Sequence, residues 1–67
     1  MNILICDDDK HYVDRIRKYV DEFFVERKIT DYMVYEYYSG EEAAKNTKKI
    51  DIAFLDVEMK LHFLFFH

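Results

Sequence analysis

Two short apolar runs in this 67-residue chain each end in aspartate, and this repetition constrains the fold more than any other feature. The first run spans residues 3–6 and leads into three aspartates at 7–9, and the second spans residues 52–55 and leads into Asp56. Continuous apolar runs of this length are typical of strands buried on both faces of a parallel sheet. Neighbouring strands lie only about 4.8 Å apart. If the two strands are neighbours, at least three carboxylates meet at one edge of the sheet.

Carboxylates gathered in this way favour a bound cation. Two like charges 4 Å apart repel by roughly 4 kcal/mol at an effective dielectric constant near 20, whereas a small domain is stable by only about 5–15 kcal/mol. Solvation of the strand ends, or protonation of one carboxylate, is the alternative. Mg²⁺ prefers one or two carboxylates completed by waters and a phosphate oxygen. We therefore expect a Mg²⁺ site here.

The segment from about 10 to 28 has the periodicity of an amphipathic helix. Asp9 is suited to cap its start, and Arg27 and Lys28 place positive charge in its last turn. The apolar stripe recurs at spacings of three and four: Val13, Ile16, Val20 and Phe24. This stripe predicts core packing.

The middle of the chain predicts a second strand and a second helix. Residues 33–38 are rich in strand-forming side chains, and Glu36 indicates an edge position. Ser39 and Glu42 form a capping box for a short helix through about residue 47. The order strand, helix, strand, helix, strand is typical of an α/β fold with a parallel sheet. Right-handed crossovers predict the strand order 2-1-3, with the acidic ends at the reversal of strand order where such sheets bind ligands.

Composition excludes several classes of function. The chain has 51% hydrophobic residues and a net charge of −4 without a basic stripe, which argues against disorder and nucleic-acid binding. No window of about 18 apolar residues predicts a membrane span. The acidic N-terminal segment does not fit a signal peptide. A single cysteine, Cys6, excludes an internal disulfide, and we expect a cytoplasmic protein.

These motifs resemble the receiver domains of bacterial two-component response regulators. Residues 3–9 resemble the first strand of that family with its acidic pair, and residues 51–59 resemble the third strand with its phosphoacceptor aspartate. The likeness is greatest to regulators with a LytTR-type output domain. It covers residues 1–59 and implies a truncated flavodoxin-like (CheY-like) βαβαβ unit. The apolar tail at 60–67 does not match the family.

The resemblance implies a role for each acidic residue. Asp56 would accept a phosphoryl group from a sensor histidine kinase and would also bind Mg²⁺. Asp8 would bind the metal directly, Asp7 mainly through a water, and Glu58 through its backbone carbonyl. Asp9 is expected to cap the helix. The chain would then be a phosphoprotein of a phosphorelay without an enzymatic activity of its own.

Two further hypotheses remain open, because the family is about twice as long and the Ser or Thr and the Lys of its later strands have no counterpart here. The second hypothesis is a remnant that is not phosphorylated and forms a homodimer through the edge of the third strand or through the tail. The third is a Mg²⁺-dependent phosphohydrolase of the haloacid dehalogenase type. It is disfavoured because His11 stands where that motif has Thr.

Overall fold

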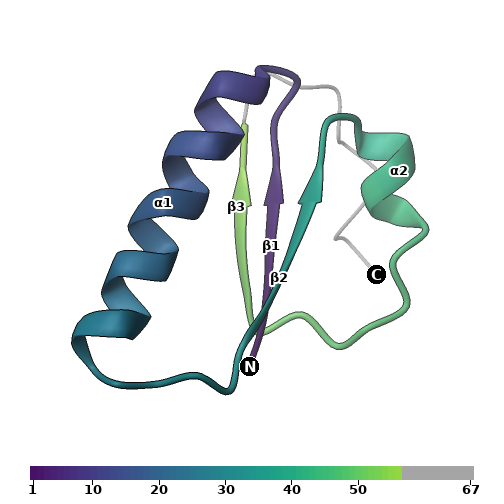
Figure 1. Ribbon diagram of the computed structural model, residues 1–67. Coiled ribbons are helices and arrows are strands. Elements are labelled where there is room, and N and C mark those ends of the chain that lie inside the picture. The colour runs from purple at the N-terminus through teal and green to yellow at the C-terminus, as the bar shows by residue number, and fades with distance from the viewer. Residues whose placement is uncertain (57–67) are drawn as a thin grey trace.

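The computed structural model describes residues 1–56, which form a small α/β unit (Figure 1). The predicted Glu58 ligand and the tail at 60–67 lie outside the described residues. All described strand pairs are parallel, and the sheet has the order β2-β1-β3, so the predicted α/β class with a parallel sheet and the predicted strand order are confirmed. The five elements are β1 (Asn2–Cys6), α1 (Lys10–Glu26), β2 (Met33–Tyr37), α2 (Gly40–Ala44) and β3 (Ile52–Leu55).

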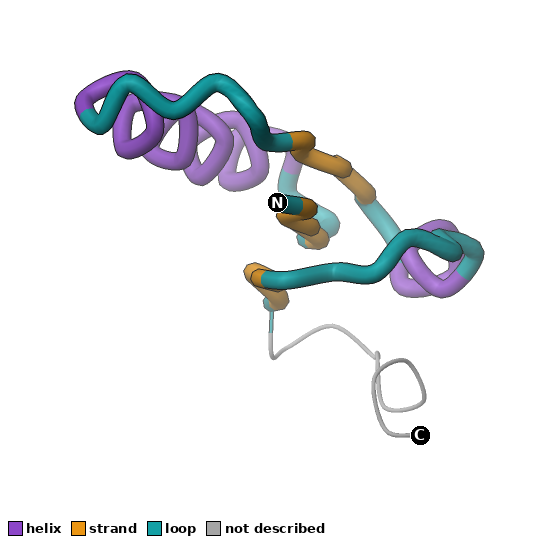
Figure 2. The backbone as a smooth tube through the Cα atoms, turned by 90° about the horizontal axis from the view of Figure 1, so that it is seen from below, coloured by secondary structure: helices purple, strands orange, loops and turns teal. Residues whose placement is uncertain are grey.

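The two helices cover opposite faces of the sheet (Figure 2), and alternate residues of β1 supply both cores. Ile3 and Ile5 pack against the apolar stripe of α1, in which Val13, Val20 and Phe24 are buried and Ile16 is partly buried. On the other face Leu4 and Cys6 pack against Ala43 of α2. This alternation is the period of two that a strand imposes on its side chains.

The first helix begins as predicted and ends two residues early. The Asp9 carboxylate accepts a hydrogen bond from the His11 N–H at 2.9 Å, which caps the helix. At the other end Lys28 adopts φ 56°, and its N–H donates to the Val25 carbonyl. The Ile29 N–H donates to the Phe24 carbonyl at 2.9 Å. These two bonds form a Schellman motif, which ends the helix at Glu26 before the predicted basic turn.

The second helix has the predicted cap and is shorter than expected. The Ser39 hydroxyl accepts a hydrogen bond from the Glu42 N–H at 3.2 Å and donates to the Glu42 carboxylate at 3.1 Å. The helix ends at Ala44 rather than at residue 47, and Asn46 instead donates its side-chain N–H to the Tyr37 hydroxyl. The capping box therefore fixes where this helix starts, but its few apolar residues do not sustain a longer one.

β2 lies at an edge of the described sheet, as Glu36 predicts, and an ion-pair network ties it to α1. The Arg17 guanidinium lies 3.1 Å (Nε) from a carboxylate oxygen of Asp21 on its own helix and 3.1 Å (Nη1) from a carboxylate oxygen of Glu36 on β2. The Tyr32 hydroxyl donates to the second oxygen of Asp21 at 2.6 Å.

Neither described helix has the length and apolar character needed to cross a membrane.

The prediction that both apolar runs are buried on two faces is wrong for β3. All four of its residues are exposed, with Ile52 41% and Phe54 40% accessible to solvent. The reason is position: β1 has a strand on each side and a helix on each face, whereas β3 lies at the edge of the sheet and a groove separates it from α1. Within residues 1–56 no strand pairs with its outer edge.

Candidate metal centre

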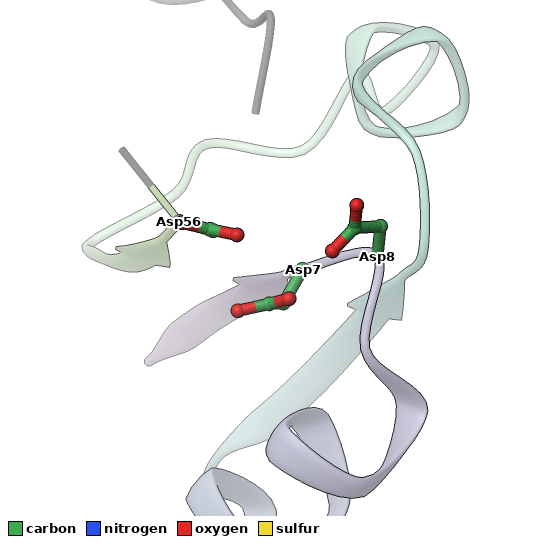
Figure 3. Close-up of side chains that lie close together, drawn as sticks. All are labelled: Asp7, Asp8 and Asp56. Atoms are coloured by element: carbon green, nitrogen blue, oxygen red, sulfur yellow. The ribbon is translucent and has the colours of Figure 1, made fainter. Parts of the chain in front are cut away.

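Three aspartates from the ends of β1 and β3 meet at one edge of the sheet, as the sequence predicts. Each of Asp7, Asp8 and Asp56 offers a carboxylate oxygen, and these oxygens all lie within 4.8 Å of one another. Cys6 and Leu55 are paired in register, and the Asp56 N–H donates to the Cys6 carbonyl at 3.2 Å. The strand pairing therefore continues into the site and sets the carboxylates side by side (Figure 3).

The three carboxylates differ in exposure. Asp7 is 6% exposed and is the buried polar residue of the described chain, whereas Asp8 is exposed and Asp56 is half-buried. The Asp7 N–H donates to the Tyr37 carbonyl, which extends the pairing of β1 with β2 by one residue. Its side chain accepts a hydrogen bond from the Asp9 N–H at 2.9 Å. Hydrogen bonds therefore fix both the main chain and the side chain of Asp7. The exposed side chain of Asp8 has more freedom to change its position.

The environment of Asp7 raises its pKa. The hydrogen bond from the Asp9 N–H acts to lower the pKa, because it stabilises the charged carboxylate. Burial, the negative charge of Asp56, and the hydrogen bond and charge of Asp8 act in the opposite direction, and together they prevail. The pKa of Asp7 therefore lies above its ordinary value of 3.8. A cation between the carboxylates would reverse this penalty, since it favours the charged form.

The neighbouring Cys6 is part of the apolar wall of the site. It is fully buried, and its thiol donates to the Ser39 carbonyl at 3.5 Å. Burial, together with the charges of Asp7, Glu42 and Asp56, raises the pKa of Cys6 to about 11. The thiol is therefore protonated at neutral pH and does not supply a nucleophile or a soft metal ligand.

The donor set fits a hard divalent cation. An octahedral Mg²⁺ ion with oxygen ligands at about 2.1 Å places neighbouring ligands about 3 Å apart and opposite ligands about 4 Å apart. One carboxylate oxygen from each of the three aspartates lies within 4.8 Å of the others, close to this spacing. Oxygen-only ligands and the absence of an accessible thiol favour Mg²⁺ over the softer transition metals.

A cavity of about 90 Å³ is lined in part by Asp7 and Asp56. The cavity is large enough to hold water. Tyr12, Phe54 and Leu55 form part of its wall. The sequence did not point to Tyr12, because on the helical pattern it only flanks the apolar stripe. Its position three residues after the cap residue Asp9 is the one signal that places it near the acidic end.

The structure therefore brings together all three of the predicted metal-site aspartates that it describes, and it places Asp9 at the helix cap instead. The predicted backbone ligand at Glu58 lies beyond the described residues. In comparisons with known proteins, no family model, curated protein or solved structure matches this chain.

Proposed function

We propose that this chain is the N-terminal part of a response regulator receiver domain with a flavodoxin-like (CheY-like) fold, and that Asp56 is its phosphoacceptor. The observation that supports the proposal most directly is the gathering of Asp7, Asp8 and Asp56 at the carboxyl ends of two adjacent parallel strands. The strand order reverses between β1 and β3, which is where open α/β sheets bind ligands. The sequence resemblance of residues 1–59 to receiver domains supplies the family.

In the proposed reaction, a carboxylate oxygen of Asp56 attacks the phosphorus of a phosphohistidine on a sensor kinase. The bond between phosphorus and the imidazole nitrogen breaks, the electron pair leaves with the imidazole, and an acyl phosphate forms on Asp56. When bound, Mg²⁺ would supply positive charge that offsets the repulsion between a carboxylate and a phosphoryl group. A kinase of this kind would place the chain in the cytoplasm.

The three aspartates have different tasks in this proposal. Asp56 is half-buried and lines part of the small cavity, which supports its assignment as the nucleophile. Asp8 is exposed and is suited to bind Mg²⁺ directly, whereas buried Asp7 is fixed by the Asp9 N–H and is suited to act through a water. The expected fourth contribution, from the Glu58 carbonyl, remains part of the proposal.

The experiment is phosphorylation by a small donor. The purified chain is incubated with Mg²⁺ and acetyl phosphate, and intact mass and peptide mapping locate the product. We expect one alkali-labile phosphoryl group on Asp56, none in the Asp56→Asn variant, and none in the presence of EDTA. The matched control is Asp14→Asn, since Asp14 is an exposed aspartate of α1 outside the cluster.

Two outcomes would contradict the proposal. A folded chain that binds Mg²⁺ but gains no phosphoryl group would show that the acidic site does not perform this transfer. Steady release of phosphate from simple phosphate esters would instead indicate the phosphohydrolase hypothesis, in which Asp7 rather than Asp56 is the nucleophile.

A further inference from the structure

Tyr12, in the first turn of α1, lines the same small cavity as Asp7 and Asp56. Among the described residues that line this cavity Tyr12 is the most exposed, at 46%, compared with 40% for Phe54. Its side chain therefore lies partly against the cavity and partly in water. This position is at the boundary between the cavity and the solvent, and the proposed transfer of a phosphoryl group gives Tyr12 no task.

The cavity lies on the face of the sheet that α1 covers. Alternate residues of a strand share a face. Ile5 belongs to the core beneath α1, so Asp7, two residues further on, continues that face. Phe54 lines a groove together with α1, and Asp56 follows it by two residues in the same way. The first turn of α1 also lies at the same end of the sheet as the carboxyl ends of β1 and β3 (Figure 1). Both aspartates are therefore on the side of the sheet where Tyr12 lies.

Hydrogen bonds and packing fix the main chain of Tyr12 relative to Asp7. The Tyr12 N–H donates to the Asp9 carbonyl at 3.1 Å, and the Asp9 N–H donates to the Asp7 carboxylate at 2.9 Å. The next residue, Val13, is fully buried, and its N–H donates to the same Asp9 carbonyl. Ile16, one turn further along the same face of α1, is partly buried against the core and also lines the cavity. The Tyr12 ring is therefore attached to a firmly held part of the helix.

We propose that the Tyr12 side chain shields the acyl phosphate of Asp56 from water and so sets how long the phosphorylated state lasts. This inference rests on the proposed function, because it concerns the product of that reaction. Hydrolysis begins when a water oxygen attacks phosphorus. The bond between phosphorus and the Asp56 oxygen then breaks, its electron pair returns to the Asp56 carboxylate, and both hydrogens of the water remain with the inorganic phosphate that leaves.

The size of the cavity and the chemistry of its wall support a shielding role. The cavity is large enough to hold water, so the competing nucleophile can lie in the same cavity that Asp56 lines. Sites that exclude water protect reactive intermediates from hydrolysis. Shortening Tyr12 to a methyl group opens the cavity toward the solvent, whereas removing its hydroxyl alone leaves the ring in place. Because part of the ring is already in water and other apolar residues complete the wall, we expect a severalfold effect.

The test follows the loss of the phosphoryl group from the full chain. The protein is loaded with acetyl phosphate and Mg²⁺, the donor is removed by rapid desalting, and intact mass gives the phosphorylated fraction over time. Tyr12→Ala should raise the rate constant of loss about three- to tenfold, and Tyr12→Phe should leave it unchanged. The matched control is Tyr19→Ala, because Tyr19 is 59% exposed on the same helix and does not line this cavity. It should also leave the rate constant unchanged.

The outcomes separate this inference from the proposed function. A wild-type chain that gains no phosphoryl group overturns both. A phosphorylated wild type that loses the group no more slowly than Tyr12→Ala overturns the shielding role alone. Faster loss in Tyr12→Phe would assign the effect to the hydroxyl instead of the ring, and equal acceleration by Tyr19→Ala would assign it to a general loosening of α1. Circular dichroism melts check that each variant is folded, and Tyr12→Ser provides the same test if Tyr12→Ala is not.

Discussion

The strands β1 and β3 share one sequence pattern and differ in almost everything that surrounds them. Each contains four consecutive apolar residues followed by aspartate, and the two lie side by side in register. The apolar residues of β1 are at most 1% exposed, whereas the large side chains of β3 are about 40% exposed. The local pattern therefore determines that both segments are strands, and the neighbours of each strand determine how much its side chains contribute to stability.

The same difference extends into the acidic site. Asp7 follows the central strand and is buried and held by backbone hydrogen bonds, whereas Asp56 follows the edge strand and is half-buried. The proposed phosphoacceptor thus follows the less covered of the two strands. Asp7 and Asp8, the other two aspartates of the proposed metal site, follow β1, the most deeply buried strand of the described sheet.

The largest expected effect comes from removing the same side chain from each strand. Ile3 and Ile52 are paired in register, and they are 1% and 41% exposed. Ile3→Ala should cost about 2–5 kcal/mol, the usual range for a buried isoleucine. That is a large part of the total stability of a small domain, which is about 5–15 kcal/mol. Ile52→Ala should cost less than half as much, because much of the side chain is already in water.

Urea unfolding at low protein concentration, monitored by circular dichroism, measures both changes without a contribution from self-association. Equal losses for the two variants would show that β3 is as well covered as β1 in solution. The comparison between the strands would then fail.

The second largest expected effect is stabilisation by Mg²⁺. The cation should slow hydrogen exchange in β3 and so reduce its difference from β1. A cation that binds only the folded chain stabilises it by about 2.7 kcal/mol at one hundred times its dissociation constant. Because the ligands come from both strands, hydrogen exchange should slow most at the end of β3 next to Asp56. Asp8→Asn should abolish the gain, and Asp14→Asn should retain it. A gain that persists in Asp8→Asn would place the cation elsewhere.

Local sequence signals are enough to predict the helix starts and the strand order. Asp9 and Ser39 are capping residues that mark the helix starts, and the apolar runs with right-handed crossovers lead to the order β2-β1-β3. The end of α1 could not be predicted, because Lys28 occupies a left-handed position where glycine or asparagine is the usual signal. The exposure of β3 could not be predicted either, since it depends on which elements cover the strand.

The candidate site shows the same division between local pattern and surroundings. The meeting of Asp7, Asp8 and Asp56 follows from strand order alone, and the structure confirms it. The burial of Asp7 and the exposure of Asp8 depend on the packing around the end of β1. Because the two residues are adjacent and of the same type, the sequence does not predict which of them is buried. Phosphorylation of Asp56 and the binding of Mg²⁺ remain predictions.

The smallest expected effect is a dependence of stability on pH that comes from Asp7. Its pKa in the folded chain is raised above the ordinary value of 3.8 by burial and by Asp56 and Asp8, against the hydrogen bond from the Asp9 N–H. Above pH 3.8 the folded chain therefore binds more protons at this residue than the unfolded chain does. The stability that Asp7 contributes is fully present below this pH and is lost as the pH rises through the folded pKa.

The difference in urea midpoint between the wild type and Asp7→Asn, measured in EDTA from pH 3.5 to 7, isolates this contribution. In EDTA the wild type should lose stability relative to the variant as the pH rises. With Mg²⁺ the trend should reverse, because the metal binds the charged carboxylates that repel one another without it. A difference independent of pH in EDTA would mean that burial and the neighbouring charges do not raise the pKa of Asp7. The contrast between the buried and the exposed strand would then not extend to the acid that follows β1.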